Sequence, residues 1–220
     1  MIDGLDAIFF DNDGVLVDTE PLFLRATQEI LATVDVHFGE DEYAEICMRQ
    51  GKSVFSIASE RGISDAEILE LRDVRDARYS DLIDAGVTVL DGVAETLGRL
   101  HGTLPLAIVT SSGKEHFARI HSQTELLPHF EFVLADGDYQ NHKPHPEPYL
   151  AAAQRLDVDP ARCLVIEDTE RGLVAAAEAG MRCVVIPTGP SLGGDFRRAH
   201  ARLNSMRELS ALLAIEGKTT

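Results

Sequence analysis

Positive charge is scarce in this chain. Lys and Arg together number 20 against 37 Asp and Glu, which gives a formal net charge of −17 at pH 7. Because nucleic acids and anionic membrane surfaces bind proteins mainly through clustered Lys and Arg, this balance disfavours both as partners. A small phosphorylated metabolite is still compatible with it, since a divalent cation and one or two placed lysines can reverse the field locally.

Cysteine and long apolar runs are scarce as well. Cys47, Cys163 and Cys183 are widely spaced and odd in number, which argues against a disulfide framework or a four-cysteine zinc site. The sequence contains no run of eighteen apolar residues, and its first residues lack the basic, apolar and small-residue series of a secretion signal. We therefore expect a cytoplasmic protein that does not enter membranes, and a monomer or weak homo-oligomer.

What the chain does contain is a regular alternation of strand-like and helix-like segments. With 220 residues that are 45% hydrophobic, it can form a substantial core. From residue 91 onward, apolar runs alternate with amphipathic stretches, the last near 206–215. This order predicts an α/β fold, a Rossmann-like and mostly parallel sheet with helices on both faces. The predicted strands are 6–10, 104–110, 130–135, 163–167 and 182–187.

An insertion separates the first two predicted strands. About ninety residues lie between them, far more than one crossover helix needs. Their pattern is almost wholly helical, over 20–34, 40–50, 53–62 and 64–86. We predict an α-helical cap of residues 16–86 on a catalytic core of residues 1–15 and 87–220, with hinges at 14–20 and 86–91.

Four short motifs carry the chemistry. The first, IFFDNDGVLVDTE at 8–20, places Asp11 and Asp13 just past an apolar strand. The others are IVTSSG at 108–113, HKP at 142–144 and VIEDTERG at 165–172. Each ends or follows an apolar run, so each can lie at the carboxyl edge of one parallel sheet. Two aspartates, a hydroxyl, a lysine and a second acidic pair are the groups that a metal-assisted phosphoryl transfer requires.

The residue types suggest a role for each group. Asp11 is positioned as a nucleophile that forms an aspartyl-phosphate, and Asp13 as the general acid and base. A carboxylate that attacks a phosphate needs positive charge between the two, and Mg²⁺ with its preference for oxygen ligands suits this task. The expected ligands are the side chains of Asp11 and Asp168, the backbone carbonyl of Asp13, and Glu167 directly or through water.

Further groups would hold the phosphoryl oxygens. Lys143 would supply a second positive charge to Asp11 and the phosphoryl group. A hydroxyl at the end of the 104–110 strand would donate a hydrogen bond; Ser111 is our first choice, with the amide of Ser112 beside it and Thr110 as the alternative. Two further candidates for substrate contacts are Lys52 and Lys114.

Together, the four motifs resemble those of the haloacid dehalogenase superfamily, in the branch with a helical cap after the first strand. That branch includes β-phosphoglucomutase and many sugar and metabolite phosphatases. The resemblance covers nearly the whole chain and is most specific in EDTERGLVAAAEAGM and HKPHPEPYLAAA. It implies the same roles for Asp11, Asp13, Ser111 and Lys143, and magnesium binding by Glu167 with Asp168. The second aspartate of the first motif, Asp13, favours phosphate chemistry over carbon–halogen cleavage.

Three positions depart from the pattern. Asn12 stands where the family usually has an apolar residue. Phe23 occupies the position of a histidine in mutase-like caps, and Lys52 is the nearest cation to Gly51, where a mutase-like cap would carry an arginine. The last two departures favour a magnesium-dependent phosphatase of a small phosphorylated metabolite, such as a sugar phosphate, over a β-phosphoglucomutase-like isomerase. A phospho-accepting signalling module is a weaker alternative, because receivers are about half as long and carry no large cap.

Overall fold

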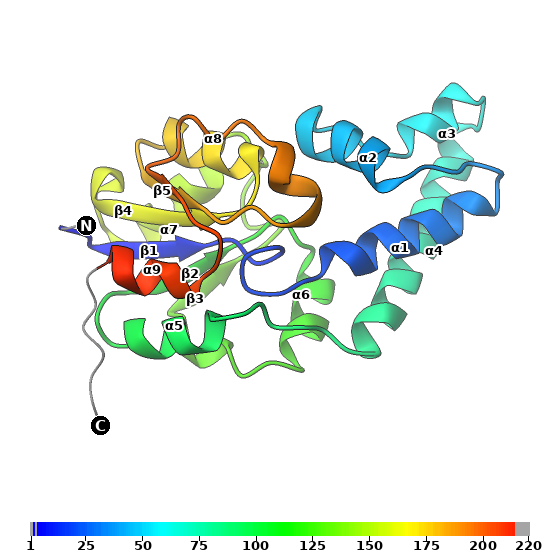
Figure 1. Cartoon of the computed structure of the whole chain (residues 1–220). Helices are drawn as coiled ribbons and strands as arrows, with labels where there is room; N and C mark the ends of the chain where they lie inside the picture. The colour runs from blue at the N-terminus through cyan, green and yellow to red at the C-terminus, as the bar shows by residue number, and fades with distance from the viewer. Residues whose placement is uncertain (1, 3, 214–220) are drawn as a thin grey trace.

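The computed structural model describes residues 2 and 4–213, which contain a six-stranded parallel sheet flanked by helices (Figure 1). The strand order is β3-β2-β1-β4-β5-β6, with β1 in the interior of the sheet. The predicted Rossmann-like α/β fold is thereby confirmed. The strands are β1 Ala7–Phe10, β2 Leu106–Val109, β3 Phe132–Leu134, β4 Cys163–Glu167, β5 Arg182–Val185 and β6 Ala201–Arg202.

Both faces of the sheet are covered, which explains why β1 and β2 are apolar throughout. In β1, Ile8 and Phe10 belong to an apolar cluster with α5, α6 and α9, whereas Ala7 and Phe9 belong to another with α7 and α8. All four β1 side chains are fully buried. Strands buried on both faces read as continuous apolar runs rather than alternating ones. The five helices are α5 Val93–Leu100, α6 Lys114–His121, α7 Glu147–Leu156, α8 Glu170–Glu178 and α9 Arg207–Leu212.

The differences from the predicted elements are local. The stretch 40–50, expected as one helix, divides into α2 and a π-helical turn, η1. Helix α9 ends at Leu212, and residues 214–215 of the predicted last helix lie outside the described residues, as does the GKTT tail. Strand β6 was not predicted, because two residues are too short to make a recognisable apolar run. The described residues also contain short 3₁₀ helices: η2 Leu127–His129, η3 Pro160–Arg162 and η4 Gly189–Gly193.

The helices of residues 20–84 gather beside the carboxyl edge of the sheet (Figure 1). They have an apolar cluster of their own, with Leu31, Phe38, Tyr43, Phe55 and Ile68 at its centre. This separate cluster fits the predicted helical cap, whose boundaries at 16–86 stay a prediction. The inserted elements are α1 Glu20–Ala32, α2 Glu40–Tyr43, η1 Ala44–Arg49, α3 Ser56–Glu60 and α4 Asp65–Asp84.

The two predicted hinge segments lie side by side. Asp18 donates from its backbone N to the Thr88 carbonyl at 2.9 Å, and Leu90 donates to the Leu16 carbonyl at 3.0 Å. An isolated bridge joins Val17 to Val89 between these bonds. The two crossings between the inserted helices and the sheet therefore form one paired ribbon.

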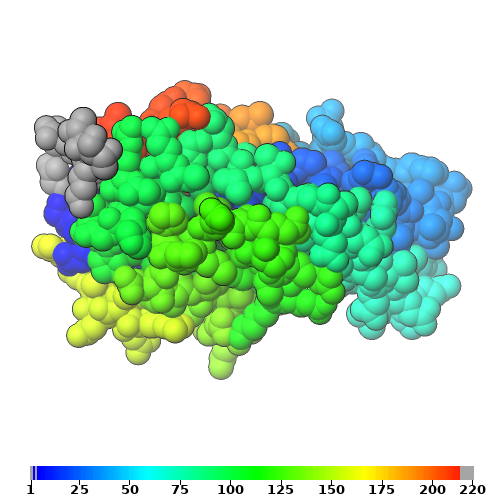
Figure 2. Space-filling model, turned by 90° about the horizontal axis from the view of Figure 1, so that it is seen from below, coloured from blue at the N-terminus to red at the C-terminus, as the bar shows by residue number. Residues whose placement is uncertain are grey.

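One helix of the core also packs on the inserted helices. Arg119 of α6 contacts Asp84 at the end of α4 at 2.8 Å, and the Gln123 amide donates to the Ile83 carbonyl at 2.8 Å. Figure 2 shows the α4 and α6 segments forming one continuous surface on this face. Among the helices of residues 2 and 4–213, none is long and apolar enough to cross a membrane.

Candidate active site

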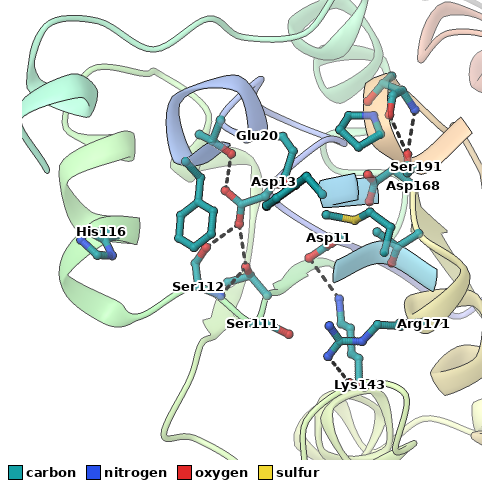
Figure 3. Close-up of a pocket in the computed structure, with 18 of the residues that line it drawn as sticks. Asp11, Asp13, Glu20, Ser111, Ser112, His116, Lys143, Asp168, Arg171 and Ser191 are labelled. Atoms are coloured by element: carbon teal, nitrogen blue, oxygen red, sulfur yellow. Dashed lines mark hydrogen bonds and ion pairs between the residues drawn. The ribbon is translucent and has the colours of Figure 1, made fainter. Parts of the chain in front are cut away.

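The predicted motifs meet at the carboxyl edge of β1, β2 and β4. Asp11 follows β1 directly, Thr110 follows β2, and Glu167 ends β4 with Asp168 next to it. Since β1 pairs with β2 on one side and β4 on the other, this is the point where the chain order of the sheet reverses, a usual place for ligands. A cavity of about 350 Å³ opens there between the sheet edge and the inserted helices (Figure 3).

Lys143 joins two of the predicted carboxylates. Its Nζ lies 3.0 Å from Asp11 Oδ1 and 2.8 Å from Glu167 Oε1, and it also donates to the Val109 carbonyl at 2.9 Å. Burial disfavours the charged ammonium, but Asp11 and Glu167 outweigh that effect and raise the pKa of Lys143. The lysine is therefore a fixed cation that lines the cavity beside Asp11.

Burial is the largest influence on the pKa of Asp11. It raises the pKa of Asp11 to about 7, although the Lys143 ammonium acts in the opposite direction. The carboxylates of Glu167 and Asp13 add to the increase, because like charges disfavour ionisation. Additional positive charge beside Asp11 would favour the ionised form that a nucleophile needs.

Glu167 is held by hydrogen bonds at both oxygens. Oε1 accepts from Lys143 and from the Tyr149 hydroxyl at 2.9 Å, while Oε2 accepts from the backbone N of Asp168 and from the Thr169 backbone and hydroxyl. Burial alone would raise the pKa of Glu167, but the Lys143 charge and these bonds hold it below its usual range. A side chain that is this fully engaged supports the site more readily than it serves as a direct metal ligand.

Asp168 is different, because one of its oxygens lacks a partner. Oδ1 is buried without a hydrogen bond from any described residue. Burial, together with the charges of Glu167 and Asp11, raises the pKa of Asp168 well above its usual value. A Cβ on Gly14, whose φ is +76°, would collide with the Asp168 carboxylate, so the glycine is needed for this close approach.

These observations fit a divalent cation. Ligand oxygens of Asp11, Glu167 and Asp168 lie within 4.8 Å of one another. A buried carboxylate oxygen without a partner is costly, and a hard cation with oxygen ligands would satisfy it. Asp11 and Asp168 are the side chains best placed to hold such an ion, with Glu167 behind them.

Asp13 accepts hydroxyl hydrogen bonds from both sides of the cavity. Thr19, at the start of α1, donates to Oδ1, while Ser112 and Thr110 donate to Oδ2, the latter at 3.3 Å. Figure 3 shows Asp13 and Ser112 together on one wall, with Asp11 between them and Lys143. The second aspartate is thus held by hydrogen bonds and lines the same cavity as the first.

The surroundings of Ser111 and Thr110 differ in a way that bears on the phosphate-binding hydroxyl. Thr110 is fully buried; its hydroxyl donates to Asp13 and accepts from the Ser112 amide at 3.0 Å. Ser111 is exposed and lines the cavity. Ser111 is thus the more accessible of the two hydroxyls, while the Ser112 amide, expected to face the phosphoryl group, is engaged by Thr110.

The two weaker lysine candidates lie outside this cavity. Lys114 is exposed and pairs with Asp138 at 2.5 Å. Lys52 lines a second cavity among the inserted helices. Neither contacts the residues around Asp11.

Several lining residues were not predicted. Arg171 belongs to the fourth motif and follows its acidic pair by three positions, so the motif itself could have indicated it. Ser191 lies after β5, at the same sheet edge, in a segment expected to be only a loop. Glu20 is the last residue of the first motif, but no role was predicted for it; burial raises its pKa to about 7 despite a hydrogen bond from Tyr43.

Asn12 has a polar partner beneath the loop, while its Nδ2 is buried without a hydrogen bond from any described residue. It is fully buried, and its Oδ1 lies 2.8 Å from His121 Nε2 on α6. Burial lowers the pKa of His121 to about 4, so the imidazole is neutral near pH 7. A polar pair replaces the apolar contact expected here.

Comparisons with known proteins agree with this geometry. The model of the haloacid dehalogenase-like hydrolase family matches residues 8–186. Protein CbbY of Rhodobacter capsulatus is 34% identical, over 90% of this chain and 92% of its own length. Hexitol phosphatase B of Escherichia coli is 30% identical, over 93% of this chain and 94% of its own.

The fold is also similar to that of solved structures over nearly the whole chain. A mutant of CbbY from Rhodobacter sphaeroides, in complex with xylulose-(1,5)bisphosphate, has a TM-score of 0.81 and 26% identity and covers 93% of this chain and 96% of its own. The family model thus spans most of the sequence, including all four motifs that converge on the cavity. The chain belongs to the haloacid dehalogenase-like hydrolases.

Proposed function

We propose that the chain is a magnesium-dependent phosphatase that hydrolyses a small phosphorylated metabolite through an aspartyl-phosphate. The observation that carries this proposal is the contact of Asp11 with Lys143 at 3.0 Å beside the partnerless oxygen of Asp168. It unites a nucleophile, a fixed cation and an unsatisfied metal ligand in one cavity. The phosphatases among the relatives and the sugar bisphosphate bound to the CbbY mutant support a sugar phosphate as the kind of substrate.

In the first step, an Asp11 oxygen attacks phosphorus and the bond between phosphorus and the leaving oxygen breaks. Asp13 gives that oxygen a proton, so the product leaves as an alcohol. Lys143 and the hydroxyl of Ser111 stabilise the phosphoryl oxygens. A bound Mg²⁺ would supply further positive charge at the carboxylates of Asp11 and Asp168.

In the second step, water attacks the phosphorus of the aspartyl-phosphate. Asp13, now deprotonated, accepts a proton from this water, and the bond between phosphorus and Asp11 breaks. Inorganic phosphate leaves and Asp11 is restored. The hydrogen bonds from Thr19 and Ser112 hold Asp13 where it can serve in both steps.

Phosphate release from a panel of sugar and polyol phosphates, measured with Mg²⁺ and with a chelator, tests the proposal. We expect phosphate release with Mg²⁺ and none with the chelator. The Asp11→Asn variant should lose at least roughly a thousandfold in kcat, because the other catalytic groups cannot act without the nucleophile. Hydrolysis that survives in that variant contradicts the covalent route. Stoichiometric isomerisation of a sugar phosphate without phosphate release contradicts the phosphatase and favours the mutase.

A further inference from the structure

The residue between the two aspartates of the first motif is bonded to a helix of the core. Asn12 Oδ1 lies 2.8 Å from Nε2 of His121, the last residue of α6, which is 4% exposed. The other ring nitrogen, Nδ1, lies 2.8 Å from the Thr124 hydroxyl. A neutral imidazole has one donor and one acceptor, and both are used when Nε2 donates to Asn12 and Nδ1 accepts from Thr124. His121 therefore bonds to the loop of residues 11–17, the aspartate loop, without lining the cavity.

Asn12 is also the centre of the backbone hydrogen bonds of the aspartate loop. Its carbonyl accepts from the backbone N of Leu16 at 2.8 Å, and from the residues before and after Leu16 at 3.3 and 3.2 Å. Its own backbone N–H donates to the Asp11 carboxylate. Because the peptide groups on either side of Asn12 connect it to Asp11 and Asp13, a rotation at Asn12 would change the direction of both carboxylates. Fixing the Asn12 side chain therefore helps to fix both.

The helix that provides His121 is itself packed on two sides. Phe117 belongs to the apolar cluster that contains the buried side chains of β1, and Ile120 belongs to a cluster with Val17 of the aspartate loop and residues of the inserted helices. Figure 3 shows the start of this helix, with His116, beside the cavity. A helix held in this way can serve as a fixed support for the loop.

The polar pair beneath the loop lowers stability, which indicates a role other than packing. The Asn12 amide nitrogen is buried without a hydrogen bond from any described residue. A buried donor without a partner destabilises a fold relative to an apolar side chain of similar volume. Local features that reduce stability are expected mainly where function requires a fixed geometry. The position of Asn12 between Asp11 and Asp13 is such a place.

We propose that His121 is a positioning residue for phosphoryl transfer and acts through Asn12 to fix the backbone between Asp11 and Asp13. This inference rests on the proposed function. Attack by Asp11 requires its oxygen in line with the leaving oxygen, while Asp13 must reach that same oxygen. Both carboxylates come from one short loop, so a small rotation of the loop displaces both. Lys143 is held by other contacts, so the loss of the His121 bond should affect substrate binding little.

The kinetics of two His121 variants test this role, with the phosphate ester of the panel that is hydrolysed fastest. His121→Leu removes the donor, and we expect kcat to fall about tenfold while KM stays within about twofold of the wild-type value, because orientation affects the chemical steps more than binding. His121→Gln keeps an N–H donor at the same distance along the side chain, and its kcat should stay within about threefold of wild type.

Thr96→Val is the matched control for the loss of a buried hydrogen bond. Thr96 of α5 is buried, donates to the Met206 carbonyl at 3.0 Å and lines neither cavity. This variant should lower the urea midpoint without changing kcat. If Thr96→Val reduces kcat as much as His121→Leu does, the effect of His121 is one of general stability and the inference is overturned.

A double variant shows whether the two residues act through each other. Asn12→Leu removes the acceptor and should also lower kcat about tenfold. If His121 acts through Asn12, the variant with both Asn12→Leu and His121→Leu should lose no more than either single variant. An additive loss of about a hundredfold contradicts the proposal. Wild-type kcat in the double variant or in His121→Leu contradicts it as well.

Hydrogen exchange measures the aspartate loop without turnover. In His121→Leu, with a chelator present, the amides of residues 15–17 should exchange about tenfold faster than in the wild type, whereas those of β4 should be unchanged. If the wild type hydrolyses no phosphate ester, the proposed function fails, and the exchange still decides whether His121 fixes the loop. Unchanged exchange of residues 15–17, or equal acceleration in β4, overturns the inference even if kcat falls.

Discussion

Lys143 is the residue whose loss should disturb the protein most. It is 5% exposed and contacts both Asp11 and Glu167. Lys143→Met would leave two buried carboxylates without their cation, and we expect the free energy of unfolding to fall by roughly 3–5 kcal/mol. Urea unfolding measures the change. Lys114→Met removes an exposed pair with Asp138 and should cost at most about 1 kcal/mol, so equal losses in the two variants would contradict this account.

Glu20 should make stability depend on pH. Burial raises its pKa from 4.5 to about 7, so the folded state retains a proton that the unfolded state has released between these values. The contribution of Glu20 to the free energy of unfolding therefore falls as pH rises from 4.5 to 7 and no longer changes above pH 7. Glu20→Gln has no group that titrates at this position. Its free energy of unfolding should therefore rise relative to that of the wild type by about 1–3 kcal/mol between pH 4.5 and 7.

Unfolding midpoints of both proteins between pH 4.5 and pH 8, in the presence of a chelator, measure the Glu20 contribution. Glu60→Gln, at an exposed position in α3, is the control and should follow the wild type. A constant difference between Glu20→Gln and the wild type at all pH values would show that Glu20 does not titrate in this window.

At the scale of elements, two glycines in helices should respond oppositely to the same change. A Cβ on Gly172, in the first turn of α8, would collide with the Glu167 carboxylate, whereas nothing lies within 4 Å of a Cβ on Gly98 in α5. We expect Gly172→Ala to destabilise the protein by roughly 2 kcal/mol or more, because α8 must move away from β4. Gly98→Ala should stabilise it by about 0.5–1 kcal/mol. Thermal unfolding distinguishes the two, and destabilisation by both would contradict the packing described for α5.

The strands were predictable because a single physical rule determines their sequence pattern, whereas residues at strand ends were less predictable. Parallel strands buried on both faces made the sheet evident, and their shared carboxyl edge brought Asp11, Lys143 and Asp168 together as expected. Strand ends are uncertain by a residue, which is why Thr110 and Ser111 could not be separated. The partner of Asn12 is 109 residues away, and local pattern carries no information about it.

The walls contributed by the inserted helices were the least predictable part of the site. Glu20, Tyr43 and Arg75 reach the cavities only because of how α1, α2 and α4 pack, and their helical pattern reports only which side of each helix is apolar. Lys52 was identified as a candidate from its place near Gly51, but the arginines of α4 that line the same cavity were not. The organisation into a sheet and an inserted bundle was therefore within reach of the sequence, whereas the basic lining of the second cavity was not.

For the whole molecule, net charge should govern the response to salt. At −17 the folded chain repels itself, and compaction brings these charges closer than they are in the unfolded chain. Screening by KCl should therefore raise the urea midpoint between about 0.02 and 0.3 M salt, as the Debye length falls from about 20 Å to below 10 Å. A chelator keeps divalent ions out of the comparison. A midpoint that falls with salt would mean that the surface ion pairs outweigh the repulsion.

The paired ribbon formed by 14–20 and 86–91 limits how the inserted helices can move. Two connections joined by hydrogen bonds between 16–18 and 88–90 resist twisting about each other more than they resist bending. The inserted helices would then move toward and away from the sheet edge by a hinge motion, without rotating about their own long axis. This motion would widen or narrow the opening of the cavity beside Asp11, while Lys52 and Phe23 would stay on the same side of Asp11.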